Sequence, residues 1–401
     1  MCHFDNADTG WKVSTLRYLY PMIYLDNNAT TRLDPRVLDA MMPFLTDVYA
    51  NAASTHPFGV AAHEGVKIAR QQIADLLGSE AHEIVFTSGA TEAINLAIKG
   101  VAENYQQKGQ HIVTVQTEHK AVLDVCGYLE TRGFEVTYLP VRPDGLLDLD
   151  TVQAAIRPDT ILVSVMMVNN ETGVIQPIRE LAALAHNAGA LFMTDATQAV
   201  GKLPIDVDDL GIDLLTCSAH KLYGPKGVGA LFVRQRRPGK VKLPALLHGG
   251  GHERGLRSGT LNVPGIVGFG KACEVAQKEM TGDTNRIGAL RDQLETELLS
   301  ISGTRINGFR EHRLYNTTNI YFEYCDSDAM IMSLEGIAVS NGSACTSASI
   351  DPSHVLLAMG LSEQEAFSCL RFSLGRFNTG EDVLATIAAV KGVVAELRAL
   401  V

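Results

Sequence analysis

The stretch IDLLTCSAHKLYGPKGVG, residues 212–229, decides the fold class of this chain. It opens with the apolar run 212–216, whose length and composition predict a buried strand. The small polar turn 217–221 follows and places Lys221 where the strand ends. Open α/β sheets bind ligands at this edge, and a partly desolvated lysine there can lose its proton and attack a carbonyl. The alternative is a surface lysine beside a loop.

A second stretch, ALFMTDATQAVGK at 190–202, favours the reactive lysine. It reads as another apolar strand that ends at Asp195, with Gln198 three residues later. A lysine and an aspartate at neighbouring strand ends are the pair that a pyridoxal phosphate (PLP) site needs. The lysine forms a Schiff base, and the carboxylate keeps the pyridine nitrogen protonated so that the ring acts as an electron sink.

Strands and helices alternate between residues 83 and 229, which predicts an α/β fold with a mostly parallel sheet and helices on both faces. Each expected strand runs into a polar turn or a helix start. These places hold Thr91, His119, Asn170, Asp195 and Lys221. They all follow strands, so we expect them along one edge of the sheet.

The turn TSGATE, residues 87–92, lies between an expected strand at 83–86 and a helix at 93–106. Free backbone N–H groups and the helix dipole at such a turn can bind an anion such as a phosphate. An ordinary helix N-cap without a ligand is the alternative.

The chain order also predicts the domain organisation. Residues 1–21 form an N-terminal extension, and 22–32 form a segment that packs with the smaller domain. Asp34 caps a helix that Pro35 opens. We place the large domain at 33–262 and a small α+β domain at 263–401, because Pro264 opens a long helix to about residue 300.

Composition restricts the function further. The chain has 401 residues, a formal charge of −11 and 46% hydrophobic residues, which fits a globular enzyme and argues against direct nucleic-acid binding through phosphates. It has seven cysteines without a C-x-x-C pair, so we expect no disulfide framework and a cytoplasmic location. No apolar run is long enough to cross a membrane.

Cys345 lies in the run SNGSACTSAS at 340–349, which is almost wholly small and polar. We expect an exposed, mobile loop there and a reactive thiol. We expect the cysteines in apolar or helical settings to be core residues, and Cys325 is open between the two interpretations. This core group comprises Cys126, Cys217, Cys273 and Cys369.

The loop HGGGHERGLRSGT at 248–260 carries His248, His252 and Glu253. Three glycines between the histidines argue against a metal-binding helix, so we expect a flexible connector or a loop that reaches a neighbouring subunit. Near the C-terminus, Arg371 and Arg376 lie in the alternating run 370–377. We expect one to grip a substrate carboxylate and the other to form a surface ion pair.

Nine motifs in chain order then resemble the cysteine desulfurases of the NifS/IscS class, over almost the whole chain from Ile23. They are DNNATT, TSGATE, TEHKAV, VNNE, DATQ, SAHKLYGPKG, GGGHERGLRSGT, SNGSACTS and RFSLGR. The resemblance implies a homodimeric PLP enzyme of the fold-type I, aspartate-aminotransferase-like class. It also implies that L-cysteine is converted to L-alanine while the sulfur passes to Cys345 as a persulfide and then to an acceptor protein.

The resemblance also implies the role of each site residue. Lys221 is the Schiff-base lysine and proton shuttle, and Cys345 is the nucleophile. His119 stacks on the ring and assists proton transfer. The other expected cofactor contacts are Asp195 at the ring nitrogen, Gln198 at the ring hydroxyl, and Ala90, Thr91, Ser218, His220 and the neighbouring subunit's Thr260 around the phosphate. Asn170 and Arg371 hold the substrate carboxylate. No resident metal is expected, apart from a transient contact of Cys345 with an iron–sulfur cluster.

Two features depart from the pattern. Residues 1–21 precede it, and Met22 is an alternative start. The chain ends at Val401, whereas housekeeping members carry a longer tail that helps to dock the iron–sulfur scaffold. The acceptor therefore stays open between iron–sulfur cluster assembly, tRNA thiolation and DNA phosphorothioation. A PLP lyase acting on selenocysteine or cysteine sulfinate is the alternative activity, and a non-catalytic sulfur carrier is a third.

Overall fold

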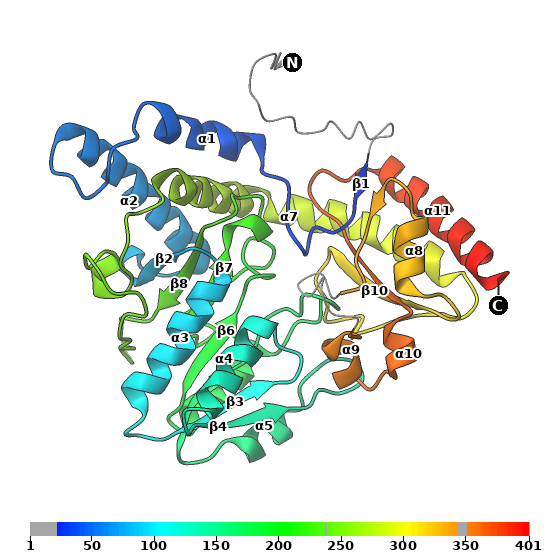
Figure 1. The fold of residues 1–401 in the computed structure, drawn as a ribbon, viewed down its shortest axis with the longest axis horizontal. Helices are drawn as coiled ribbons and strands as arrows, with labels where there is room; N and C mark the ends of the chain where they lie inside the picture. The colour runs from blue at the N-terminus through cyan, green and yellow to red at the C-terminus, as the bar shows by residue number, and fades with distance from the viewer. Residues whose placement is uncertain (1–21, 237–238, 343–350, 401) are drawn as a thin grey trace.

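A computed structural model describes residues 22–236, 239–342 and 351–400. Its centre is a seven-stranded sheet with the order β2-β8-β7-β6-β5-β3-β4 (Figure 1). Only β8 runs antiparallel to its neighbours, and the other pairings are parallel, which confirms the predicted α/β class. The strands are β2 (Ile84–Thr87), β3 (His111–Val115), β4 (Glu135–Leu139), β5 (Thr160–Ser164), β6 (Leu191–Asp195), β7 (Leu214–Ser218) and β8 (Gly229–Val233).

Helices cover both faces of this sheet because its strand side chains alternate between two apolar layers. Ile112, Leu162 and Met193 face the layer that contains α3 (Ala90–Tyr105) and α4 (Lys120–Glu130). Their strand neighbours, such as Val113 and Phe192, face the opposite layer. That layer is built by α1 (Pro35–Thr46), α2 (Pro57–Leu77), α5 (Leu149–Ala155), α6 (Ile178–Asn187) and the first half of α7 (Val263–Leu299).

The C-terminal part is a smaller α+β unit beside the sheet. Its antiparallel sheet has the order β12-β10-β9 and packs against the second half of α7 and against α11 (Gly380–Arg398). Leu25 is buried in the same apolar cluster. The remaining elements are β1 (Ile23–Tyr24), η1 (Ala81–Glu83), η2 (Ala219–Lys221), η3 (Glu253–Gly255), β9 (Thr304–Ile306), β10 (Thr317–Phe322), α8 (Ser327–Ser333), β11 (Ile337–Ala338), α9 (His354–Ala358), α10 (Glu363–Ala366) and β12 (Cys369–Ser373).

Helix α7 belongs to both units. Phe269 and Cys273 lie in the core beneath the large sheet, whereas Leu294 and Leu298 lie in the C-terminal core. The N-terminal strand β1 also belongs to the C-terminal unit, because it pairs in parallel with β11. Residues 22–26 and α7 therefore both connect the two units. The segment that follows β1 reaches the carboxyl ends of the strands of the large sheet, where Asn28 and Ala29 contact Lys221.

Four predicted boundaries were wrong, the first being that of β2, which runs over Ile84–Thr87 instead of 83–86. Strand β7 runs over Leu214–Ser218, two residues later than predicted, because its ladder with β8 extends from Leu214–Val233 to Ser218–Gly229. Helix α3 begins at Ala90 instead of residue 93. Strand β12 ends at Ser373, so Arg376 lies beyond it. For β7 and β12, pairing with a distant strand sets the boundary, whereas α3 simply begins after its N-cap Gly89.

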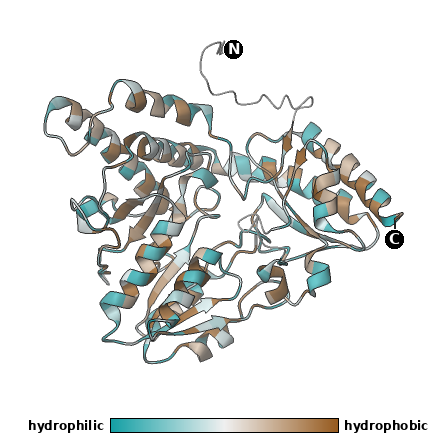
Figure 2. Cartoon of the chain, viewed as in Figure 1, coloured by the Kyte–Doolittle hydropathy of each residue, from teal (hydrophilic) through white to brown (hydrophobic). Residues whose placement is uncertain are grey.

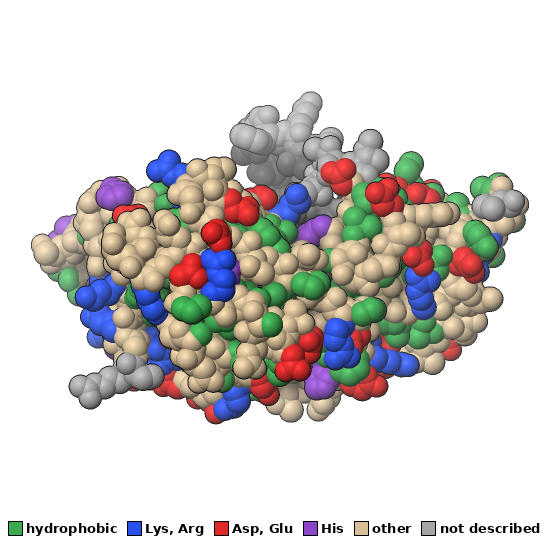
Figure 3. Space-filling model, turned by 90° about the horizontal axis from the view of Figure 1, so that it is seen from below, with side chains coloured by type: hydrophobic (Ala, Val, Ile, Leu, Met, Phe, Trp, Pro, Cys, Tyr) green, Lys and Arg blue, Asp and Glu red, His purple; other side chains and the backbone are tan. Residues whose placement is uncertain are grey.

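The surface adds two observations. Hydrophobic residues gather on the inner sides of the strands and helices (Figure 2), and acidic and basic side chains are interspersed on the face shown in Figure 3. No helix among the described residues combines the length and apolarity that a bilayer crossing needs.

Candidate active site

A cavity of about 560 Å³ lies at the carboxyl ends of the central strands. This size is within the range of small-molecule and cofactor sites. Ten of the residues singled out in the sequence line it: Ala90, Thr91, His119, Asn170, Asp195, Gln198, Ser218, His220, Lys221 and Arg371. The prediction of a shared sheet edge concerned five of them, Thr91, His119, Asn170, Asp195 and Lys221, and for these it is confirmed.

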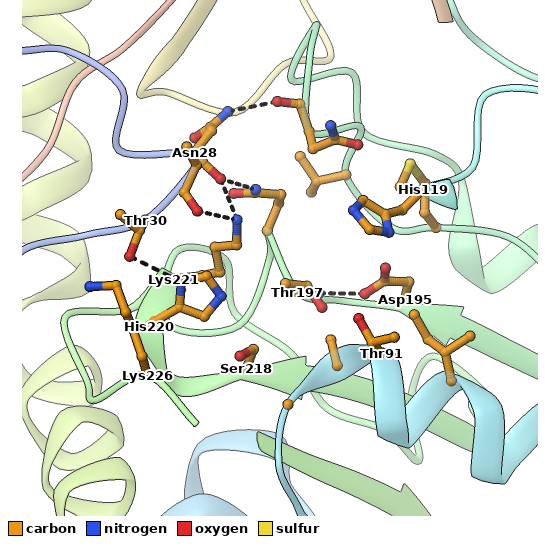
Figure 4. A pocket seen from close by; sticks show the side chains of 18 of the residues that line it. Asn28, Thr30, Thr91, His119, Asp195, Thr197, Ser218, His220, Lys221 and Lys226 are labelled. Atoms are coloured by element: carbon orange, nitrogen blue, oxygen red, sulfur yellow. Dashed lines mark hydrogen bonds between the residues drawn. The ribbon is translucent and has the colours of Figure 1, made fainter. Parts of the chain in front are cut away.

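Lys221 ends the short helix η2, directly after β7. Its Nζ donates hydrogen bonds to the backbone carbonyl oxygens of Asn28 at 2.6 Å and Ala29 at 2.7 Å (Figure 4). The amine thus sits at the cavity wall, held by a segment almost two hundred residues away in the sequence. A half-buried amine in this place can reach a carbonyl group bound in the cavity.

Asp195 is the last residue of β6, and its side chain is buried. Oδ1 accepts hydrogen bonds from the Thr197 backbone N–H at 3.0 Å and from the Thr216 hydroxyl at 3.3 Å. Within the described chain, both of these bonds engage the same oxygen, and no lysine or arginine forms an ion pair with this carboxylate. A buried carboxylate arranged in this way suits a cationic N–H group from a ligand.

His119 is the N-cap of α4, and its Nδ1 accepts a hydrogen bond from the Ala121 backbone N–H at 3.1 Å. A nitrogen that accepts from an amide carries no proton, so the neutral ring carries its proton on Nε2. Figure 4 shows the ring directed into the cavity, above Asp195. The helix cap therefore fixes the tautomer, with the proton of the neutral ring on Nε2.

The other end of the cavity is suited to an anion. Ala90 and Thr91 open the sixteen-residue helix α3, whose first N–H groups face the cavity. Ser218, His220 and Lys226 line the same end. The His220 ring bonds to the Thr30 hydroxyl at 3.0 Å, and burial lowers the pKa of His220 to about 4, so the ring is neutral near pH 7.

Glu92 is the one acidic residue in the first turn of α3. An ion pair of 2.8 Å with Arg257 compensates its charge, and the Ser88 backbone N–H donates to the same carboxylate at 2.8 Å. The Gly-rich loop 248–260 thus contributes a cation to this end of the site through Arg257.

Arg371 reaches the cavity from β12. Its guanidinium donates to the Asn170 carbonyl at 3.0 Å and forms an ion pair of 2.6 Å with Asp26. Arg376 instead pairs with Asp34 at 2.9 Å and Asp283 at 2.9 Å, away from the cavity. Arg376 thus forms the ion pair expected for one of the two arginines, but the expected surface position was wrong, because its side chain is only 10% exposed and that of Asp34 only 2%.

Two site predictions need separate comment. Cys345 lies outside the described residues, although its near neighbour Gly342 lines the cavity. Thr260 is exposed and does not line the cavity of this single chain. All five cysteines that the structure describes are buried and free, including Cys325, which sequence analysis left open.

Of the two expectations for the loop 248–260, a flexible connector or a loop that reaches a neighbouring subunit, the structure of this single chain contradicts the first. Glu253 is buried, and its carboxylate forms a two-pronged ion pair with Arg70 at 2.6 and 2.7 Å. The Phe86 backbone N–H also donates to it at 2.9 Å. The sequence did not predict this ion pair. The glycines of the loop indicated a flexible backbone, and a local pattern cannot show that Glu253 has a partner as distant in the sequence as Arg70. No group of three or more His, Cys, Asp or Glu residues in the described ranges could hold a metal.

Sequence reasoning missed the part that residues 26–30 play. Asn28, Ala29 and Thr30 line the cavity, and Asp26 holds Arg371. The motif DNNATT was a usable signal, because it is a polar turn after an expected strand, as are the other turns that carry site residues. Lys202 and Glu171, both buried beside the site, also went unnoticed.

These features fit PLP. The buried carboxylate of Asp195 lacks a cationic partner among the described residues, and the pyridinium N–H is such a cation. The helix N-terminus with Thr91, Ser218 and Lys226 suits a phosphate group. Lys221 lies in the same cavity and supplies the amine that the cofactor's aldehyde requires.

Comparisons with known proteins agree with this geometry. The family model for aminotransferase class V matches residues 23–385. The chain is 55% identical over 381 residues to cysteine desulfurase IscS of Haemophilus influenzae (strain PittGG), covering 94% of each chain. It is 56% identical over 363 residues to cysteine desulfurase IscS of Anaeromyxobacter dehalogenans (strain 2CP-C), covering 90% of this chain and 89% of the relative.

Solved structures give the same result. A NifS-like protein superposes with a TM-score of 0.87 at 38% identity, covering 94% of this chain and all of the other. SspA in complex with cysteine superposes with a TM-score of 0.78 at 41% identity, covering 89% of this chain and all of the other.

Fold and cavity together define an enzyme of aminotransferase class V, a PLP-dependent family with the fold-type I architecture. Within that class, the chain belongs to the cysteine desulfurases, which convert L-cysteine to L-alanine and transfer its sulfur.

Proposed function

We propose that the cavity around Lys221 binds PLP and L-cysteine and delivers the substrate sulfur to Cys345 as a persulfide. The buried Asp195 carboxylate, aligned in one cavity with Lys221 and the α3 N-terminus, carries this proposal. PLP, when bound, supplies an aldehyde that takes up the amino group of the substrate and a ring that delocalises the electron pair left at Cα. Asp195 would pair with the ring nitrogen, and Gln198 would contact the ring hydroxyl.

Phosphate binding is assigned to Ala90, Thr91, Ser218 and His220. Because His220 is neutral, it serves as a hydrogen-bond partner, and the helix dipole and Lys226 supply positive charge. Thr260 of a second subunit would complete this end.

Two bases can move protons in the site. Lys221 would remove the substrate Cα proton once its amine is neutral, and it lies beside the cavity with its Nζ near the Asn28 carbonyl. His119 would exchange a proton at Nε2, because Nδ1 is engaged by the helix cap. That atom can take the proton of a thiol before attack.

Arg371 and Asn170 would hold the substrate carboxylate. Asp26 and the Asn170 carbonyl fix one side of the guanidinium, which presets its direction before substrate binds. A preset arginine loses less freedom on binding, and this favours the two-pronged grip that an amino acid carboxylate allows.

Cys345 would be the nucleophile. It is three residues along the chain from Gly342, which lines the cavity. The Cys345 thiolate attacks the substrate sulfur, and the carbon–sulfur bond breaks with its electron pair left on the substrate. Protonation of that carbon gives L-alanine, and the enzyme retains a persulfide for an acceptor protein.

The sulfur acceptor is proposed from the relatives. Relatives named IscS favour iron–sulfur cluster assembly, with tRNA thiolation and DNA phosphorothioation as the other routes. A selenocysteine or cysteine sulfinate lyase is the second candidate, and the presence of Cys345 in the motif SNGSACTS argues against it. We also propose a cytoplasmic location, since a persulfide enzyme needs reduced thiols.

A homodimer is supported by exposed apolar side chains on α1, on α2 and on the segment 47–56 between them, at one edge of the molecule in Figure 1. Large apolar side chains project there although the rest of each helix packs on the core. They are Leu38, Met42, Leu45, Tyr49 and Phe58. Such a face is typical of a subunit interface, which sedimentation of the purified protein would test.

The decisive experiment mixes the purified protein with L-cysteine and a thiol reductant and measures sulfide and alanine together. We expect equal amounts from the wild type. C345A should keep the bound cofactor and its spectral response to cysteine, but form little of either product. A fully active C345A protein would move the assignment to the lyase, and a wild type that binds PLP without releasing alanine would exclude the desulfurase reaction.

A further inference from the structure

Lys202 lies behind the wall of the cavity, in the turn that follows β6. Its side chain is 4% exposed. Its Nζ donates a hydrogen bond to Gln198 Oε1 at 2.9 Å. The charged groups that act on it are Lys221 and Arg371, which are both cations. Burying a lysine beside two other positive groups is unfavourable, so its presence calls for a functional reason.

Lys202 fixes the direction of the Gln198 amide. In its protonated form the Lys202 amine can only donate, so the amide atom that then faces it is the oxygen. The amide nitrogen then points the other way and donates to the Asn28 carbonyl at 2.9 Å, and a carbonyl can only accept. The donor Lys202 and the acceptor carbonyl of Asn28 therefore together set one orientation of the Gln198 amide, which lines the cavity.

The same contacts connect Lys202 with Lys221. The Asn28 carbonyl that accepts from Gln198 also accepts from Lys221 Nζ at 2.6 Å (Figure 4). The path runs from Lys202 through Gln198 and the Asn28 carbonyl to Lys221, and it lies entirely within the described residues.

Charge links the two amines as well. Burial, together with the charges of Lys221 and Arg371, lowers the pKa of Lys202 to about 7. Such coupling is reciprocal, so a proton on Lys202 disfavours a proton on the nitrogen of Lys221. Lys202 also contributes to the low pKa of His220, after burial, Lys221 and Lys226. Asp26 partly balances the third cation, Arg371.

We propose that Lys202 is a positioning residue of this active site, which orients the Gln198 amide and places a second positive charge behind Lys221. The inference rests on the proposed function, because it concerns the nitrogen through which Lys221 would be joined to PLP. That nitrogen must become neutral and nucleophilic during the reaction, and a neighbouring positive charge favours the neutral form. Gln198, with its amide N–H groups turned away from Lys202, would donate to the ring hydroxyl oxygen.

The test compares wild type with K202M, K202R and K202Q, and uses K271M as a matched control. Lys271 lies in α7 and pairs with Glu274, so K271M removes a lysine charge outside the site. The measurements are the pH titration of the absorption band of bound PLP and the PLP dissociation constant. In K202M we expect the absorption pKa to rise by about one unit and the dissociation constant to increase about 5-fold. K202R should restore both values, and K271M should match wild type.

K202Q separates the effect of the Lys202 charge from that of its hydrogen bond to Gln198. It also provides a second variant for the test if K202M does not fold. It retains an uncharged donor for Gln198, so its absorption pKa should rise while its PLP affinity stays near wild type. An unchanged absorption pKa in folded K202M or K202Q, or an equal shift in K271M, would overturn the inference. A wild type that does not bind PLP would instead reject the proposed function, so the two failures are distinguishable.

Discussion

Glu171 provides a pH-dependent test of how the site is built. It follows Asn170, it is almost fully buried, and the Ser353 hydroxyl donates a short hydrogen bond to its Oε2. Burial raises the pKa of Glu171 to about 7, and Ser353, Arg371 and His119 only partly oppose this rise. The folded protein therefore keeps a proton on Glu171 at pH values where the unfolded chain has lost it.

The sign and size follow from that difference. A raised acid pKa contributes stability that is complete below the ordinary value of 4.5 and is lost as the pH rises through about 7. At about 1.4 kcal/mol for each pKa unit, the loss reaches about 3 kcal/mol at pH 8. A chain of 401 residues has an unfolding entropy of about 0.8 kcal/mol per kelvin, so this loss corresponds to about 4 °C.

E171Q replaces the carboxyl group by an amide that never ionises. We expect its thermal midpoint to exceed that of wild type by about 1 °C at pH 5 and about 4 °C at pH 8, measured by circular dichroism at one scan rate. E279Q is the control: the hydrogen bond to Arg36 lowers the pKa of Glu279, so its stabilisation is nearly complete above the ordinary value of 4.5. The thermal midpoint of E279Q should therefore differ from that of wild type by nearly the same amount at pH 5 and at pH 8. A gap between E171Q and wild type that stays constant over this pH range would refute the argument.

Two further predictions concern the same region. R371K should lower kcat/KM for L-cysteine by about 10- to 100-fold, mainly through KM, because lysine cannot grip a carboxylate with two prongs; an unchanged KM in steady-state kinetics would remove Arg371 from the substrate site. G342A should lower the thermal midpoint, since Gly342 has φ +94° and an added Cβ would lie 2.4 Å from Glu171 Oε2, a strain of about 1–3 kcal/mol. G282A is its control: Gly282 lies in α7 with open space around it, so alanine there should raise the midpoint, and equal effects of the two substitutions would contradict the packing argument.

Much of the fold could be predicted because its signals are local. The apolar run of β6 ends at Asp195 and the helix α4 begins after His119, and each boundary is written within a few neighbouring residues. The rule that strand ends of a parallel sheet share one edge then brought these side chains together without any knowledge of distant contacts. Where pairing with another strand decided the boundary, as for β7, the prediction was displaced.

By itself, the sequence determined the α/β class, the order of the strands' functional turns and the chemical type of the groups at each strand end. Only the tertiary structure decided what holds those groups. Asn28 supports Lys221 across 193 residues of sequence, and Asp26 fixes Arg371 across 345. It also decided that Lys202 and Glu171 are buried beside the site, although charged residues usually face water. The reason is physical: periodicity and turn residues record the preferences of a short segment, whereas a side chain's burial, partners and proton affinity depend on the packing of segments that are distant in the chain.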